Sequence, residues 1–377
     1  MGTVRKLLRW GTLGLGGSLA AVATVLGIAL LIPGCSVGYV TRQSVVHLKV
    51  LAARQDIDQA IARGEVPEEW LPKIETLRDA KRFGAEELGL PTEDLYETIS
   101  LADVGPTWIV TACPQDALEP ITWWFPIVGR VAYKGYYNKD GAERLAAKLR
   151  AEGNDVLMYP SAAFSTLGWF DDPIRPSMLR GDDEQVANLV LHEAAHAVLY
   201  WKGQTSFNES FASFVGDVGA IRYLEARFGP GCDRCRRAIA AREDAPRFGA
   251  LIERVVERLR KLYGRSIPRE EKLRRREDVF AWAREEYDRV PWSGNTYAGF
   301  RSRPLDNAVI LSYRRYGQGQ DAFDALLRRC DGDLRRAIAA VWELNWPGLG
   351  RAERRSTTPM ELLERRLEEP APCPPAG

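Results

Sequence analysis

The sequence predicts an α+β protein that is mostly helical, in which a small mixed sheet precedes a pair of packed helices. Three observations support this fold class. Apolar residues recur at helical spacing over residues 43–101. Segments rich in β-branched and aromatic residues, bounded by proline and glycine, follow over residues 107–159. Helical spacing then returns from residue 183 and continues to residue 346.

The first 34 residues have the layout of a signal peptide. Arg5, Lys6 and Arg9 form a positive region, and apolar and small residues follow over 11–31. The segment ends in Leu-Ile-Pro-Gly before Cys35, which resembles the bacterial lipobox, where the cysteine is acylated. We therefore expect residues 1–34 to be removed and Cys35 to be lipidated. The alternative is an uncleaved transmembrane helix, because about 20 apolar residues can span a bilayer.

Either anchor places the protein in the bacterial cell envelope. We expect it on the periplasmic side of a membrane, and Ser36 directly after the cysteine resembles an outer-membrane sorting signal. The chain carries 52 Lys and Arg against 51 Asp and Glu. A net charge of +1 provides no basic field for nucleic acid, so we expect no nucleic-acid partner.

The mature chain divides into four predicted parts. An N-terminal helical segment covers 35–105, a sheet with two central helices covers 106–230, a helical region covers 231–369, and 370–377 form a disordered tail. The expected helices lie at 43–62, 71–84, 92–101, 140–152, 183–202, 208–228, 234–263 and 269–289, with two more between 304 and 346. The expected strands lie at 107–113, 121–125, 128–133, 155–159 and 164–170.

Residues 192–196 read His-Glu-Ala-Ala-His, an H-E-x-x-H pattern with apolar flanks. Positions i and i+4 lie on one face of a helix, so His192 and His196 can both reach one tetrahedral Zn²⁺. Glu193 projects beside the metal, where it can take a proton from zinc-bound water. The alternative is a pair of core histidines. With only three histidines in 377 residues, the agreement of spacing, flanks and helix favours zinc.

A catalytic zinc needs a third protein ligand and an open position. His47 is remote in sequence, whereas Glu209 follows His196 after a short connection at the start of the next helix. Helices joined so tightly should pack antiparallel, which turns Glu209 back toward His196. Glu209 as an ordinary surface residue near a helix N-terminus is the alternative. Asp217 is a rival ligand that we instead expect to support a ligating histidine or to be structural.

H-E-x-x-H followed by Asn-Glu-x-Phe-Ala at 208–212 resembles the gluzincin metallopeptidases, especially aminopeptidases with an N-E-G-F-A box. The twelve residues between His196 and Glu209 are fewer than in those enzymes, so the connecting loop must be tighter. Nearly the whole chain resembles a family of zinc-dependent aminopeptidases found as bacterial lipoproteins. The segments that carry this resemblance are Gly34-Cys35, Gly38-Tyr39, 125–129, 133–137, 165–173, 191–196, 207–212 and 306–308, with Tyr316 behind them.

This resemblance implies a gluzincin-like fold, a Zn²⁺ cofactor and a peptide substrate. It also implies that an edge strand before the zinc helix, here Ser165, Thr166, Leu167 and Gly168, binds the substrate backbone. No histidine follows His196, so a tyrosine is favoured to stabilise the developing charge. Of the tyrosines Tyr297, Tyr313 and Tyr316, the family pattern selects Tyr316.

We therefore expect a membrane-anchored zinc metallopeptidase, and by resemblance an aminopeptidase. Asp171 or Asp172 is the candidate to hold a free α-amine. The alternatives are a zinc endopeptidase and a lipid-anchored binding or assembly factor with a structural zinc. Cys232 and Cys235 should form a local disulfide in an oxidising compartment, with two free thiols as the alternative. Without Cys35 five cysteines remain, so at least one has no intramolecular partner.

Overall fold

The computed structural model describes residues 36–102, 105–125, 129–161, 173–201, 203–316, 320–350 and 352–375. It is mostly helical with small antiparallel sheets, which confirms the α+β class. The helices are α2 (Ser36–Ala52), α3 (Ile57–Ala62), α4 (Leu71–Leu88), α5 (Lys139–Ala151), α6 (Asp183–Val198), α7 (Thr205–Phe228), α8 (Asp233–Tyr263), α9 (Arg269–Arg289), α10 (Asn307–Tyr316), α11 (Gln320–Arg329), α12 (Leu334–Trp342), α13 (Glu353–Ser356) and α14 (Pro359–Glu368). The strands are β1 (Arg54–Asp56), β2 (Thr98–Ser100), β3 (Thr107–Pro114), β4 (Trp123–Phe125), β5 (Gly129–Val131), β6 (Lys134–Tyr136) and β7 (Asn154–Ser161).

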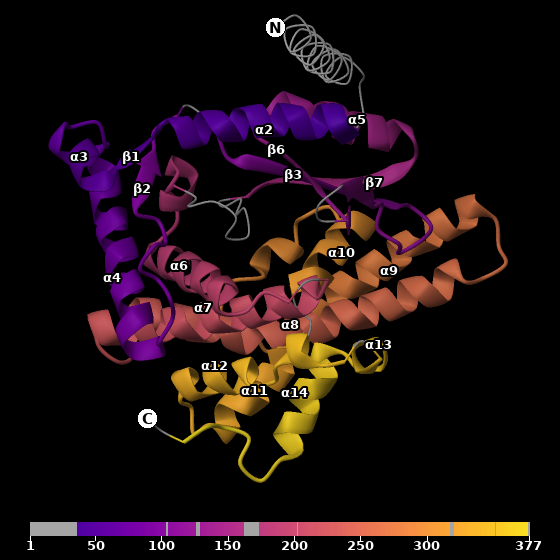
Figure 1. The fold of residues 1–377 in the computed structure, drawn as a ribbon. Helices are drawn as coiled ribbons and strands as arrows, with labels where there is room; N and C mark the ends of the chain where they lie inside the picture. The colour runs from indigo at the N-terminus through magenta and orange to yellow at the C-terminus, as the bar shows by residue number, and fades with distance from the viewer. Residues whose placement is uncertain are drawn as a thin grey trace, which may run out of the picture.

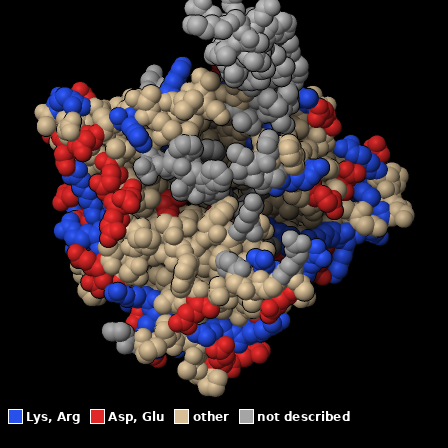
Figure 2. Space-filling model, in the orientation of Figure 1, with Lys and Arg blue, Asp and Glu red and all other residues tan. Residues whose placement is uncertain are grey.

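The molecule is layered (Figure 1). Helix α2 and the three-stranded sheet lie on one side, α6, α7 and α8 run through the middle, and α11, α12 and α14 lie on the other side. None of the helices in the described ranges combines the length and apolar character needed to cross a bilayer. On the face shown in Figure 2, side chains of both charges alternate around the edge, and the middle is largely uncharged.

Two N-terminal predictions are wrong in detail. The helix expected over 43–62 is interrupted by β1, because the Asp56 side chain accepts the Gln59 amide and starts α3 as a separate helix. Residues 92–101 are not helical. Tyr96 has a positive φ of 58°, which ends any helix there, and Ile99 in β2 pairs with Gln55 of β1.

The central sheet has the strand order β6-β3-β7, and both pairings are antiparallel. The mixed sheet that we expected is therefore wrong. Helix α5 joins two strands that run in the same direction, but β3 lies between them and opposes both, as in a split βαβ unit. Ala142, Ala146 and Leu149 of α5 are buried against this sheet. Within the range 128–133, where one strand was expected, only β5 (Gly129–Val131) is described as a strand, and it pairs with β4, whereas β6 begins at Lys134.

Helices α6 and α7 form the central antiparallel pair. Asp182 caps α6 by accepting the Gln185 amide, and the helix ends at Val198 rather than near residue 202. The buried Asn208 side chain both donates to and accepts from the backbone of Trp201, which holds the short connection closed. Glycine at 216 permits close contact, since a Cβ there would lie 3.2 Å from the Cβ of His192.

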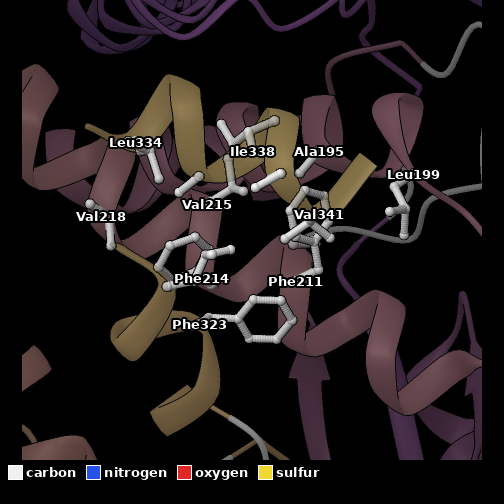
Figure 3. Packing of buried hydrophobic residues seen from close by; sticks show 14 of the residues in the cluster. Ala195, Leu199, Phe211, Phe214, Val215, Val218, Phe323, Leu334, Ile338 and Val341 are labelled. Atoms are coloured by element: carbon white, nitrogen blue, oxygen red, sulfur yellow. The ribbon is translucent and has the colours of Figure 1, made fainter. Parts of the chain in front are cut away.

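An aromatic core joins α7 to the C-terminal helices (Figure 3). The ring of Phe323 in α11 packs on Phe211 and Phe214 of α7 at centroid distances of 6.0 and 5.3 Å. Ile338 and Val341 of α12 close the cluster, and all five side chains are buried. This core holds α7, the helix that carries Glu209, against α11 and α12.

A buried polar cluster joins the sheet to the C-terminal helices. The Asn307 side chain donates to the carbonyls of Pro114, Gln115 and Ala117, and its backbone amide donates to Asp155. Arg276 also donates to Asp155, at 2.8 Å, and its side chain is only 11% exposed. Arg276 is therefore a largely buried partner of the sheet, whereas its neighbour Arg274 pairs with Glu271 at the surface.

The C-terminal region contains more structure than the sequence predicted. Three helices, not two, lie between residues 304 and 346, and α13 and α14 follow. The predicted Cys232–Cys235 disulfide is confirmed. A second disulfide, Cys330–Cys373, ties down residues 370–375, which we expected to be disordered. The remaining described cysteine, Cys113, is buried and free, in agreement with the odd count.

Asn307→Ala should lower the free energy of unfolding by roughly 2–4 kcal/mol, because it leaves several buried carbonyl groups without a donor. Urea unfolding measures this change. Asn295→Ala, at an exposed position, is the matched control. A loss below about 1 kcal/mol for Asn307→Ala would show that the polar cluster does not hold the sheet to the helices.

Glu184→Gln should change the pH dependence of stability. Burial, aided by the charges of Asp182 and Asp217, raises the pKa of Glu184 from 4.5 to about 7. The folded chain therefore binds more protons than the unfolded chain between these values, and wild-type stability falls as pH rises through this window. The free energy of unfolding of Glu184→Gln, relative to that of wild type, should therefore be higher at pH 8 than at pH 5. An equal difference at both pH values in urea unfolding would contradict the assignment.

Candidate metal centre

Three side chains that can bind a metal meet between α6 and α7. The Nε2 atoms of His192 and His196 lie 3.7 Å from separate carboxylate oxygens of Glu209. One potential ligand atom from each residue lies within 4.8 Å of the others. The histidines share one face of α6, and Glu209 lies in the second turn of α7, turned back toward them by the short connection.

The geometry of this group fits a small tetrahedral cation. With ligands at roughly 2.0–2.1 Å from zinc, tetrahedral ligand atoms are about 3.3 Å apart. The observed 3.7 Å separations are close to this value, and two imidazoles with one carboxylate form a donor set that suits Zn²⁺. His196 is 8% exposed and Glu209 is 45% exposed, so the group is buried on the helix side and accessible on the other.

The pKa shifts of His196 and Glu209 favour metal binding, whereas that of His192 is in the opposite direction. Burial, together with the nearby charge of His192, lowers the pKa of His196 to about 4, so its imidazole is neutral at pH 7. Burial raises the pKa of Glu209, but the two histidines outweigh this effect and hold it below the ordinary value. Burial alone would lower the pKa of His192, and the carboxylates of Glu209, Glu193 and Asp217 reverse the direction.

Glu193 follows His192 on α6 and is half-buried. Its carboxylate is close enough to act electrostatically on the pKa of His192. The residue is therefore near the His192 imidazole, next to it along α6.

Asp217 links the two helices one turn away from the metal-binding group. Its carboxylate accepts a hydrogen bond of 2.7 Å from Asn188, which precedes His192 by one turn of α6. Arg242 of α8 lies 3.9 Å from Asp217 and also pairs with Asp324 of α11. Burial raises the pKa of Asp217, against the influence of Asn188 and Arg242. Asp217 therefore contacts α6 through Asn188, one turn before His192.

Sequence reasoning missed Tyr200. Its ring lies edge-on to His196 at a centroid distance of 6.3 Å, and its side chain is 41% exposed. Partial burial and the charge of Glu209 raise the pKa of the phenol. Helical spacing does not signal this residue, because α6 ends at Val198 and Tyr200 lies beyond the helix. The tyrosines predicted for this role, Tyr297, Tyr313 and Tyr316, all lie beyond α7.

The other predicted residues divide into two groups. Tyr297 and Tyr313 pack on Phe248, at 4.1 and 5.0 Å, within an aromatic cluster of the C-terminal helices. Tyr316 ends α10, and its side chain is outside the described residues. The remaining predicted residues, all outside the described ranges, are Cys35, Ser165, Thr166, Leu167, Gly168, Asp171 and Asp172.

Comparison with known proteins gives one match. No curated protein and no solved structure matches the chain. The model of a family described as "Putative aminopeptidase" matches residues 38–357, which include all of α6 and α7. This match spans most of the chain and contains the complete His-His-Glu group. The chain therefore belongs to this aminopeptidase family.

Proposed function

We propose that the protein is a membrane-anchored zinc peptidase of the gluzincin type that releases residues from the N-termini of peptides. The observation that carries this proposal is the convergence of His192, His196 and Glu209, with Glu193 beside them. Family membership suggests a peptidase. The catalytic core that we propose spans residues 106–230.

A zinc ion held by the three side chains would supply a Lewis acid that lowers the pKa of water to about 7 and polarises the scissile carbonyl. Glu193 accepts a proton from the attacking water and passes it to the leaving amine. His196 and Glu209 are already in the protonation states that metal binding needs. We propose that Tyr200, whose ring lies 6.3 Å from the ring of His196, donates a hydrogen bond to the substrate carbonyl oxygen as negative charge develops there.

The aminopeptidase assignment rests on the family. We propose that residues 165–168 bind the substrate backbone as an added strand, and that Asp171 or Asp172 binds its free amine. An endopeptidase would use the same metal centre without that amine site. An assembly factor with a structural zinc would not need Glu193, so this residue favours an enzyme.

We also propose that the protein acts in the bacterial envelope, attached through Cys35 or through an uncleaved N-terminal helix. The two disulfides, Cys232–Cys235 and Cys330–Cys373, support an oxidising compartment.

Glu193→Gln should retain one zinc per chain and lose turnover by at least about 100-fold, because the general base is removed while the ligands remain. Glu209→Ala should lose zinc as well as turnover. Metal analysis and hydrolysis of amino-acid amides measure both effects, with the exposed Glu243→Gln on α8 as control. Zinc-loaded Glu193→Gln with wild-type turnover would refute the mechanism. Cleavage of peptides with blocked N-termini would replace the aminopeptidase with an endopeptidase.

Tyr200→Phe should lower kcat by about 100-fold with little change in KM or zinc content, because it removes a donor used in the transition state. Tyr297→Phe, in the aromatic cluster, is the matched control. Tyr316→Phe tests the residue that the family pattern selects. Unchanged kcat in Tyr200→Phe, with a loss in Tyr316→Phe, would transfer the role to Tyr316.

A further inference from the structure

The outer face of α2 carries an exposed stripe of apolar and basic residues. Arg42, Val45, Leu48 and Lys49 are all exposed, and their spacing places them on one side of the helix. The two apolar side chains, Val45 and Leu48, are 47% and 61% exposed and lie one turn apart. The opposite side of α2 packs on the protein, where Val50 is buried.

The β4–β5 hairpin adds a similar surface beside the start of α2. Phe125 of β4 packs against Tyr39 of α2 at a centroid distance of 5.6 Å. The adjacent Trp124 points away from this contact and is 57% exposed. It pairs across the hairpin with Arg130, which is also exposed. An aromatic and a basic side chain therefore lie close to the first turn of α2.

The position of α2 in the chain indicates what this surface contacts. Helix α2 begins at Ser36, directly after Cys35 and the apolar sequence of residues 11–31. A bilayer that holds either form of the anchor must lie close to the first turn of α2, and so close to Trp124. The 17-residue helix is about 25 Å long, so Leu48 can reach the same bilayer only if α2 lies along its surface.

The chemistry of the stripe fits a lipid surface. Tryptophan and apolar side chains are favoured at the boundary between headgroups and acyl chains, and Lys and Arg are attracted to anionic headgroups. Two apolar residues would bind weakly alone, but the anchor holds them at a high effective concentration. We propose that the outer face of α2, with Trp124 and Arg130, lies flat on an anionic phospholipid bilayer.

This orientation has a consequence for access to the metal centre. Helix α2 and helices α11–α14 are on opposite sides of the molecule, and α6 and α7 lie between them (Figure 1). The C-terminal helices would then face away from the membrane, and the metal centre would be held at a fixed height above it. The inference depends on the proposed membrane anchor, not on peptidase activity.

The test uses the full chain, purified in detergent and reconstituted into vesicles of phosphatidylglycerol and phosphatidylethanolamine. An environment-sensitive fluorophore is attached to Leu48→Cys, and separately to Val45→Cys. Its emission should shift to the blue, and nitroxide-labelled lipid should quench it at least threefold more than a fluorophore at Trp342→Cys. Trp342 is a matched control because it is 59% exposed on α12, on the opposite side.

The charged residues give a second readout. Arg42→Glu combined with Lys49→Glu should reduce the quenching at residue 48. In the labelled chain that keeps Arg42 and Lys49, replacing phosphatidylglycerol with phosphatidylcholine should also reduce this quenching. Equal quenching at residues 48 and 342, or no association of the chain with vesicles, would overturn the proposal. Quenching at 48 only after a second protein is added would assign the stripe to a protein partner instead. Hydrolysis assayed in detergent is independent of these results, so the two proposals can fail separately.

Discussion

The close contact between α6 and α7 is the constraint on which the rest of the structure depends. A metal centre built from two helices requires Glu209 to approach two imidazoles within a few ångströms, and only closely packed backbones permit this. Gly216 supplies the space opposite His192, while Gly219 accommodates Leu191 one turn further along. The double hydrogen bond between Asn208 and Trp201 fixes the connection, so that the start of α7 returns to the end of α6.

The surrounding layers hold this pair from both sides. Phe211 and Phe214 anchor α7 to Phe323 of α11. Asp217 and Asn188 join the helices across their outer faces, and Arg242 connects this contact to α8 and α11. The sheet is held to the C-terminal helices by Asp155, Arg276 and Asn307. These contacts hold His192, His196 and Glu209 in the arrangement that a metal ion would need, which reduces the cost of assembling such a centre.

Several features could be predicted because they depend on local patterns. Spacing of four residues on a helix places His192 and His196 together whatever the rest of the fold does. The long helices α8 and α9 follow from sustained helical spacing, and β3 from β-branched residues between prolines. The local Cys232–Cys235 disulfide follows from a separation of three residues. The approach of Glu209 to the histidines could be predicted because the connection between the two helices is short.

Other features depend on distant residues, and the sequence pattern does not contain them. The pairing of β3 with both β6 and β7 depends on distant residues, and it makes the sheet antiparallel where a mixed sheet was expected. The ion pair between Arg276 and Asp155 joins residues 121 positions apart, so the charged pattern of α9 does not indicate it. Cys373 can bond to Cys330 because helices α12–α14 bring the C-terminal residues back to the end of α11. The sequence by itself determined the chemistry of the metal ligands, since helical spacing is local. Tertiary structure alone decided that Tyr200 lies beside them, because α6 ends early and residue 200 turns back toward the site.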